Sequence, residues 1–338
     1  MFTQMKRWHD IRRWYVGKTK CTFEDSYLLR NCYLLRNRYK CLDRMKKNYR
    51  MYGEIGEGGA RWKDLRFLID KRNLCIPFMD LCVNSVCTLH CAKCTQGMPY
   101  LKNRTIDTAE EIIQNMEELL SRIDYIFQMG IIGGEPFLNR DLDKVISWCV
   151  NHEKIGWIVV VTNGTIFPDE KILNSLKNKK VWLGISYYEL EDDSNRKKLL
   201  DWVKREGVRY TYTEDQEWYD FLGDKLELKN YSKHILRESF ESCVIHDCVA
   251  FKGKVLYRCP KAALLYDLGV LGEYNDDMIC LDRIKGRNDM KHALKRFYCR
   301  DYLVSCQYCF AGDERKKCKP GVQVTHEDIV GMQINSLD

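Results

Sequence analysis

The sequence predicts an α/β fold in which parallel strands, joined by helical crossovers, form part of a barrel. Short apolar runs alternate with amphipathic helical stretches between residues 76 and 215, and this alternation is typical of parallel sheets. Five such strands can be read, fewer than the eight of a closed barrel. The chain is mainly helical in pattern before residue 76, and a β-hairpin replaces the alternation beyond about residue 240. We therefore expect a partial barrel between a helical N-terminal extension and a small C-terminal domain.

The domain boundaries are expected where these patterns change. A basic N-terminal extension is expected over residues 1–75 and the partial barrel over 76–240. The small C-terminal domain follows over 241–320, and a C-terminal tail over 321–338. Strands are expected at residues 78–84, 125–132, 157–161, 181–186 and 208–213, with helices at 107–123, 140–152, 168–178 and 194–206. We expect Asp107 to cap the first of these helices, with Glu110 completing a capping box.

Composition and charge exclude several classes of protein. With 45% hydrophobic and 30% charged residues the chain reads as globular. No window approaches the roughly 18 apolar residues needed to span a bilayer, and the first residues show no apolar signal region. We therefore expect a cytoplasmic protein. In that reducing compartment, clustered members of its 17 cysteines are expected to bind metal, whereas scattered ones pack as small hydrophobes.

The positive charge is concentrated at the N-terminus. Residues 1–75 hold 19 Lys/Arg and 8 Asp/Glu, a net charge of +11, so the remaining residues sum to −4 within the total of +7. One explanation of this positive excess is a helical face that is exposed to solvent. The other is a surface for an anionic partner, such as a phosphorylated substrate or an anionic membrane face. No nucleic-acid-binding signature is visible, so nucleic acid is not expected as a partner.

The predicted strand ends carry the unusual residues of the barrel. Cys87, Cys91 and Cys94 follow the first strand, Gly133-Gly134-Glu135-Pro136 the second, Thr162-Asn163-Gly164 the third, and Ser186 ends the fourth. Ligands of parallel α/β folds bind at the carboxyl ends of the strands. A structural zinc site uses four ligands, usually from two CxxC pairs. Three thiolates in one loop instead suit a cubane iron–sulfur cluster that keeps one iron open.

The Cx3Cx2C loop, followed about 40 residues later by GGEP, resembles the radical S-adenosylmethionine (radical SAM) superfamily over residues 76–215. This resemblance implies a partial TIM barrel and a 4Fe–4S cluster held by the three cysteines, whose open iron binds S-adenosylmethionine. It also implies that Gly133, Gly134 and Glu135 meet the methionine amino group and that Ser186 contacts the ribose. Asn163 would line the same rim or cap the turn that follows. Many family members have an aromatic residue before the third cysteine, where this chain has Lys93.

A second group of cysteines follows the barrel. The stretch CVAFKGKVLYRCP predicts a hairpin with Cys248 and Cys259 at its ends, and SCQYCF supplies Cys306 and Cys309. Four thiolates suit zinc as well as iron. After a radical SAM core, the set resembles the twitch or SPASM extensions, which implies one auxiliary 4Fe–4S cluster. Cys243 is an alternative to Cys248, or a free thiol that donates hydrogen to a substrate radical.

The resemblance implies a radical enzyme that works anaerobically. A 5′-deoxyadenosyl radical would abstract hydrogen from a C–H bond, and the expected outcome is oxidation or epimerisation of a sugar or sugar-derived small molecule. The alternative is a maturase that modifies a ribosomally made peptide or a protein side chain. Expected partners are a small substrate, phosphorylated or linked to a carrier, and an electron donor such as flavodoxin or ferredoxin. Peripheral membrane contact through the basic N-terminal region fits the carrier-linked case.

Overall fold

A computed structural model describes residues 67, 72–213, 218–246, 248–273 and 275–332. Nearly all of the expected N-terminal extension, and the end of the expected tail beyond Met332, lie outside these residues. Within the described part of the chain, no helix is both long enough and apolar enough to cross a bilayer.

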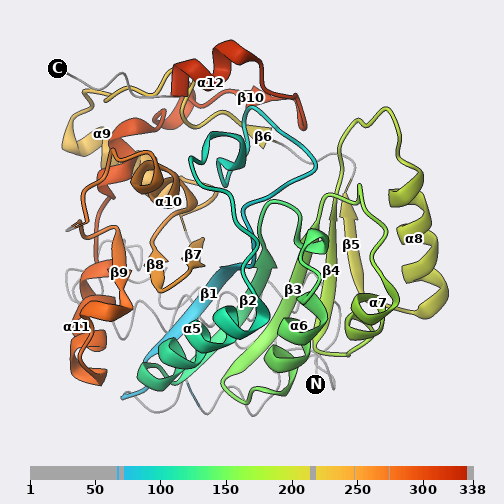
Figure 1. The fold of residues 1–338 in the computed structure, drawn as a ribbon. Coiled ribbons are helices and arrows are strands. Elements are labelled where there is room, and N and C mark those ends of the chain that lie inside the picture. Colours follow the sequence, from blue (N-terminus) through green and yellow to red (C-terminus); the bar gives the residue numbers. More distant parts are fainter. Residues whose placement is uncertain (1–66, 68–71, 214–217, 247, 274, 333–338) are drawn as a thin grey trace, which may run out of the picture.

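An eight-stranded sheet organises the structure, in the order β5-β4-β3-β2-β1-β7-β8-β9 (Figure 1). Its strands are β1 (Cys75–Cys82), β2 (Tyr125–Ile132), β3 (Ile155–Thr162), β4 (Val181–Ser186), β5 (Tyr210–Thr213), β7 (Val249–Lys252), β8 (Val255–Tyr257) and β9 (Met278–Cys280). Neighbours from β5 across to β7 pair in parallel, whereas β8 and β9 add on antiparallel. The predicted α/β class with a partial barrel of parallel strands is confirmed.

Helices connect the parallel strands and cover one face of the sheet, as Figure 1 shows. They are α5 (Ala109–Arg122), α6 (Leu142–Asn151), α7 (Glu170–Leu176) and α8 (Ser194–Glu206). Helix α5 buries Ile112, Met116 and Leu119 against the sheet, as its spacing predicts. The predicted cap of this helix was wrong by one residue. Thr108 has extended backbone, so it takes the cap position and forms the capping box with Glu111.

The C-terminal part begins after α9 (Lys233–Glu241). Strands β7 and β8 form the predicted hairpin, whose turn places Gly253 at φ +57°. This hairpin does not stand apart from the barrel, because Met79 to Leu81 of β1 pair with Val249 to Phe251 of β7. The remaining elements are α10 (Pro260–Asp267), the 3-10 helices η4 (Leu281–Arg283), η5 (Val304–Tyr308) and η6 (Gly312–Glu314), α11 (Arg287–Tyr298) and α12 (His326–Met332).

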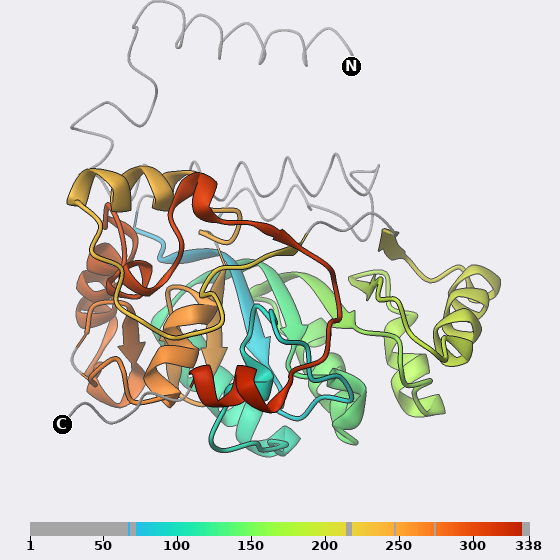
Figure 2. The same cartoon turned by 90° about the horizontal axis from the view of Figure 1, so that it is seen from above.

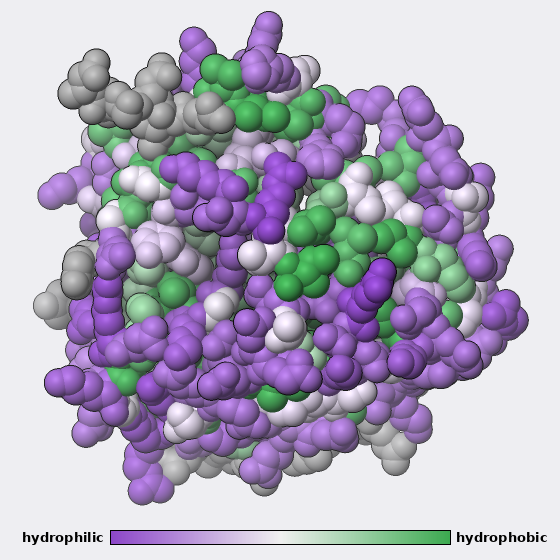
Figure 3. Space-filling view, viewed as in Figure 1, coloured by the Kyte–Doolittle hydropathy of each residue, from purple (hydrophilic) through white to green (hydrophobic). Residues whose placement is uncertain are grey.

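A second, two-stranded sheet lies across the carboxyl ends of the barrel strands. It pairs β6 (Trp218–Tyr219) with β10 (Lys317–Cys318) in antiparallel fashion. From β10 the chain crosses above the barrel towards α12, next to the loop that follows β1 (Figure 2). The face seen in Figure 3 is mainly hydrophilic, with hydrophobic residues gathered right of its centre. The barrel rim is therefore covered by segments from after the barrel.

Candidate active site

The loop after β1 brings three cysteine thiols together. Within it, the Cys94 amide donates to the Cys91 carbonyl at 3.1 Å. Burial, followed by the charges of Cys94 and Cys87, raises the pKa of Cys91 to about 12. The three cysteines that the sequence spacing singled out therefore share one loop at the carboxyl end of β1, and their charges interact.

Two N–H groups point at the sulfur of Cys87. The Leu89 amide donates to it at 3.4 Å and the Asn163 side-chain amide at 3.6 Å. Burial still raises the pKa of Cys87 to about 11. Donors of this kind stabilise a thiolate that ligates a metal and tune its electronic properties.

Asn163 combines the two roles that the sequence left open. Its Nδ2 donates to Thr88 Oγ1 at 3.0 Å as well as to Cys87, so it lies at the rim. Its Oδ1 accepts from the Thr165 amide at 2.9 Å and from the Thr165 hydroxyl at 2.7 Å, which stabilises the turn after β3. The TNGT segment is thereby tied to the cysteine loop.

Gly133 and Gly134 are required for packing against the cysteine loop. A Cβ added at Gly134 would stand 2.1 Å from the Val86 carbonyl oxygen, and one at Gly133 would stand 2.6 Å from Asn84 Oδ1. The Gly134 amide donates to Asn84 Oδ1 at 3.0 Å, and Asn84 Nδ2 donates to the Glu135 carbonyl at 2.8 Å. Asn84 is a buried residue that the sequence reasoning missed. It is the last residue of the expected first strand, and this position was its only signal.

Glu135 is fully buried below the rim. Its Oε1 accepts from the Thr162 hydroxyl at 2.8 Å and the Phe137 amide at 3.1 Å, while Oε2 accepts from the Asn163 amide at 2.8 Å. Burial raises the pKa of this carboxyl group to about 7, although the three hydrogen bonds oppose the shift. The side chain thus joins the ends of β2 and β3, and its backbone faces the loop after β1.

Ser186 ends β4, as predicted, and Tyr188 lies just beyond it. Burial raises the pKa of the Tyr188 phenol, and the charges of Cys91, Cys94 and Cys87 add to the effect. Ser186 hydrogen-bonds the phenol and acts in the opposite direction. The end of β4 therefore approaches the three thiols through Tyr188, which the sequence reasoning did not single out.

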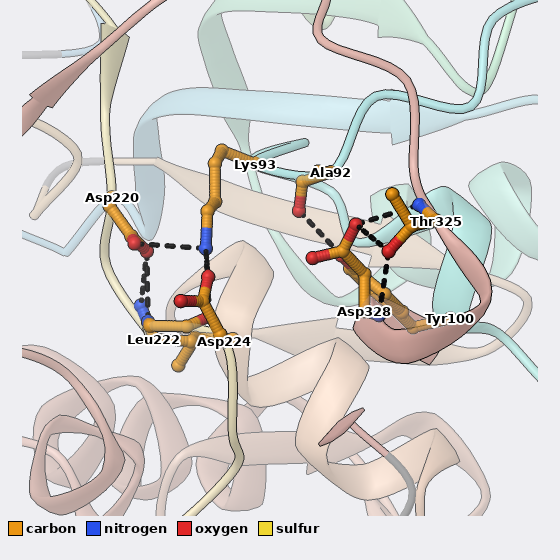
Figure 4. Close-up of polar contacts among 9 residues, drawn as sticks. Ala92, Lys93, Tyr100, Asp220, Leu222, Asp224, Thr325 and Asp328 are labelled. Atoms are coloured by element: carbon orange, nitrogen blue, oxygen red, sulfur yellow. Dashed lines mark hydrogen bonds and ion pairs between the residues drawn. The ribbon is translucent and has the colours of Figure 1, made fainter. Parts of the chain in front are cut away.

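Lys93, which replaces the aromatic residue of many family members, is held by two carboxylates. Its Nζ lies 2.9 Å from Asp220 Oδ2 and 2.6 Å from Asp224 Oδ1, and it donates to the Gly223 carbonyl at 3.0 Å (Figure 4). On the same loop, the Tyr100 hydroxyl donates to the Ala92 carbonyl at 2.6 Å. Lys93 therefore ties the cysteine loop to the segment that follows β6.

A second group of thiols lies in the C-terminal part. Burial raises the pKa of Cys259 to about 12, and the largest Coulombic contribution comes from Cys243. Burial also raises the pKa of Cys309 to about 12, with Cys259 and Cys243 adding to it. Cys306 is affected in the same way by Cys309, Cys259 and Cys243. Cys243 thus joins three of the predicted thiols, while the predicted Cys248 lies at the start of the hairpin, with its amide donating to the Ile245 carbonyl at 3.0 Å.

Lys261 lies between the two thiol groups. Its side chain is buried, and Nζ donates to the Cys94 carbonyl at 3.0 Å. Burial lowers the pKa of the ammonium group, whereas the charges of Cys94, Cys309 and Cys259 act in the opposite direction. The ring of Phe221 lies 5.5 Å from Nζ. One buried cation is therefore close to members of both groups.

Residues 81–214 match the family model of the radical SAM superfamily. The match begins within β1 and ends just after β5, so it contains the cysteine loop, the glycine segment and the last four of the five predicted strands. This part of the chain is a radical SAM domain. The sequence prediction of this family is confirmed.

Two curated radical SAM relatives are GTP 3′,8-cyclases, from Syntrophomonas wolfei and Clostridium acetobutylicum. Each is 28% identical to this chain over 102 residues, which make up 30% of this chain and 31% of the relative. The match spans about a third of the length of these relatives, so it says nothing about the remainder of either protein.

Solved radical SAM structures also resemble the chain in part. BtrN in complex with AdoMet and 2-DOIA is 17% identical, with a TM-score of 0.46, over 69% of this chain and 92% of BtrN. SuiB of Streptococcus suis bound to S-adenosylmethionine is 15% identical, with a TM-score of 0.34, over 54% of this chain and 48% of SuiB. AnSMEcpe with bound AdoMet is 19% identical, with a TM-score of 0.33, over 40% of this chain and 42% of anSMEcpe. At these identities, the chemistry has to be inferred from the chain's own residues.

The radical SAM family implies a 4Fe–4S cluster and S-adenosylmethionine. The cysteine loop fits a cluster in its donors, because it offers three grouped thiols and N–H groups directed at the sulfur of Cys87. Across the described segments, no three His, Cys, Asp or Glu side chains converge on a point that would hold one metal ion. The thiolates of a cubane bind different iron atoms, so a cluster does not require such convergence.

Proposed function

We propose that this chain is a radical SAM oxidoreductase or epimerase that acts on a sugar or sugar-derived small molecule. Cys87, Cys91 and Cys94 would hold the catalytic 4Fe–4S cluster. When bound, that cluster and S-adenosylmethionine supply a 5′-deoxyadenosyl radical, and an auxiliary cluster supplies an electron acceptor. Loss of one hydrogen atom, one electron and one proton converts a carbinol into a ketone. Return of a hydrogen atom to the opposite face of the carbon gives an epimer instead.

The observation that carries this proposal is the second thiol group beside the cysteine loop. An enzyme that only starts a radical reaction needs the first group alone. Here the candidate thiols are those of Cys259, Cys306 and Cys309 with Cys248 or Cys243, and Cys243 and Cys309 pack against the same hydrophobic cluster as Cys94. Lys261 also donates to the Cys94 carbonyl. Four thiolates suit a fully ligated auxiliary cluster. Its position next to the first group supports a route for an electron that leaves the substrate.

Residues at the strand ends would position S-adenosylmethionine. The carboxyl end of β2 leads into Gly133, Gly134 and Glu135. The end of β3 leads into Asn163, which contacts the sulfur of Cys87, and β4 ends at Ser186. The Glu135 carboxyl group holds Phe137, Thr162 and Asn163, and the backbone N–H and C=O of Glu135 are paired with Val86 and Asn84. The carboxyl group has a supporting role, which keeps the two strand ends in place.

The covered rim supports a small substrate over an extended peptide. Strand β10 pairs with β6, Gly321 packs on Tyr188, and the next residues pair with the cysteine loop. This segment therefore crosses from the end of β4 to the loop after β1, where it pairs with Cys91, the buried one of the three cysteines. A phosphorylated or carrier-linked substrate would give the basic N-terminal region an anionic group to bind, and an electron donor such as flavodoxin or ferredoxin would reduce the first cluster.

Anaerobic reconstitution tests the proposal. We expect about eight irons per chain, from two cubanes, and reductive cleavage of S-adenosylmethionine to 5′-deoxyadenosine. The triple change of Cys87, Cys91 and Cys94 to Ala should remove half of the iron and all cleavage. A panel of amino sugars, nucleotide-linked sugars and peptides then identifies the substrate by deuterium transfer into 5′-deoxyadenosine. Transfer from a peptide alone would overturn the sugar assignment in favour of a maturase, and zinc in place of iron would overturn the radical chemistry.

Single cysteine variants decide which thiols hold the auxiliary cluster. Cys259→Ala, Cys306→Ala and Cys309→Ala should each lower bound iron towards about four per chain and leave some uncoupled cleavage of S-adenosylmethionine. Cys243→Ala and Cys248→Ala distinguish the two candidates for the fourth ligand. The variant that lowers bound iron in the same way identifies the ligand, and the other variant should keep the iron.

A further inference from the structure

The segment 321–324 adds a short strand to the cysteine loop. The Ala92 amide donates to the Val322 carbonyl at 2.7 Å, and the Val324 amide donates to the His90 carbonyl at 2.7 Å. Cys91 and Gln323 are opposite one another in this antiparallel bridge. The two partners are more than 220 residues apart in the chain, so the tail predicted at 321–338 begins as part of the site.

Gly321 brings this segment onto the rim. Its φ of +75° favours glycine, and an added Cβ would stand 2.9 Å from a ring carbon of Tyr188. After the turn, the Gln323 Oε1 accepts from the His90 amide at 2.7 Å. The Nε2 donates to the Gly321 carbonyl at 2.6 Å and lies 3.9 Å from the sulfur of Cys91. One side chain therefore contacts the loop backbone on one side and a thiol on the other.

We infer that Gln323 is a positioning residue for the catalytic cluster, which fixes the loop at His90 and places an N–H donor beside the sulfur of Cys91. Cys87 has its donors in Leu89 of the same loop and in Asn163, which follows β3. Gln323 supplies the corresponding group to Cys91 from the C-terminal segment. A donor beside a ligating thiolate stabilises negative charge on the sulfur, so it raises the reduction potential of the bound cluster.

The test uses the reconstituted full-length protein and two readouts other than turnover. In Gln323→Leu, which keeps the size but removes both polar atoms, the catalytic cluster should release its iron to a chelator roughly tenfold or more faster. The midpoint potential of that cluster, followed by its EPR signal, should become more negative. Gln323→Glu keeps an acceptor for the His90 amide but replaces the donor, so it should retain iron better than Gln323→Leu while still shifting the potential to more negative values.

Val322→Ala is the matched control. Its side chain is 51% exposed, whereas its backbone carbonyl makes the bond to Ala92, so this variant should behave as wild type. Retention of auxiliary-cluster iron and an unchanged melting temperature show that a variant is folded. A folded Gln323→Leu protein with wild-type iron release and wild-type potential would overturn the inference. If Gln323→Leu fails to fold, the potential of Gln323→Glu alone decides, and a wild-type value rejects the role.

Discussion

At the scale of single residues, Lys261 is the most unusual charge in the site. The residue is only 4% exposed, and its ammonium group has the Cys94 carbonyl at 3.0 Å and the Phe221 ring as neighbours. A buried cation is costly unless negative charge lies close to it. The thiols of Cys94, Cys259 and Cys309 provide that charge once they ligate clusters. Lys261 is therefore expected to stabilise the reduced, more negatively charged states of the clusters that these thiols would hold.

The first prediction concerns this cation. Lys261→Met keeps the chain length but removes the charge, so the midpoint potentials of the clusters should become more negative in an EPR-monitored titration. Lys102→Met is the control, because Lys102 also donates to a backbone carbonyl, that of Leu268 at 3.1 Å, but is exposed to solvent. Equal potentials in wild type and Lys261→Met would show that the charge does not reach the clusters.

The second prediction concerns the pH dependence of stability through Glu135. Burial raises the pKa of this carboxyl group from 4.5 to about 7, so the folded state binds more protons than the unfolded state between these values. The contribution of the protonated carboxyl group to the free energy of unfolding is fully present below about pH 4.5 and is lost as the pH rises through 7. The shift corresponds to about 3 kcal/mol.

Urea unfolding of the metal-free, reduced protein from pH 5 to pH 8 measures this effect. The free energy of unfolding of Glu135→Gln should fall less over this range than that of wild type, by up to about 3 kcal/mol. The amide variant should also be less stable at low pH, because its N–H₂ group cannot accept from the Asn163 amide. The exposed substitution Glu170→Gln should leave the wild-type pH dependence unchanged. Parallel curves for wild type and Glu135→Gln would rule out the shifted carboxyl group.

At the scale of elements, the cysteine loop is held from outside the barrel as well as from its strands. Lys93 connects it to the segment after β6 through Asp220 and Asp224 (Figure 4). The side chains of Lys93 and Asp220 are each 18% exposed, whereas that of Asp224 is 83% exposed. An ion pair weakens with exposure, so the Asp220 contact should contribute more to stability than the Asp224 contact.

The third prediction follows from this difference in exposure. Lys93→Met should lower the free energy of unfolding by about 1–2 kcal/mol, between the values for exposed and buried pairs. Asp220→Asn should have a larger effect than Asp224→Asn. Lys144→Met, which removes a surface ion pair to Asp141 from a lysine that is 55% exposed, is the matched control and should cost less than Lys93→Met. The reverse order in chemical denaturation would contradict the role of Lys93 as a connection between segments.

At the scale of the whole molecule, the charge distribution separates the N-terminal quarter from the rest. The net +11 of residues 1–75 precedes β1, and residues 1–66 lie outside the described part of the chain. The cysteines predicted to hold the two clusters all come after residue 75 in the sequence. If the region recognises an anionic group on the substrate, cluster binding and substrate binding depend on different parts of the protein.

The fourth prediction tests this separation. Deletion of residues 1–50 should leave about eight irons and basal cleavage of S-adenosylmethionine, and it should abolish product formation. High salt should mimic the loss in the full-length protein, because the Debye length falls from about 10 Å at 0.1 M to about 3 Å at 1 M. Undiminished turnover after the deletion would leave the charge as a solvated face. An insoluble or cluster-free deletion protein would instead assign the region to packing against the barrel.

Much of the barrel could be predicted because its elements are defined by local patterns. Strands β2 and β4 and helix α8 have the predicted bounds, since apolar runs of six to eight residues and a 3.6-residue period are properties of contiguous sequence. The cysteine spacing and the GGEP segment likewise identified the family without any knowledge of contacts. The reason is that a loop with three ligands has to place them within a few residues.

Only the tertiary structure decided how distant segments complete the site. Hairpin β7–β8 joins the barrel sheet through β1, Cys243 groups with the second set of thiols, and Gln323 pairs with a loop more than 220 residues earlier. The sequence predicted the hairpin and offered Cys243 as an alternative ligand. No local pattern marks the pairing of the hairpin with β1 or the role of Gln323, because a glutamine reads the same in a tail as in a site. Their roles depend on backbone pairing between remote segments, and the packing of the whole chain determines that pairing.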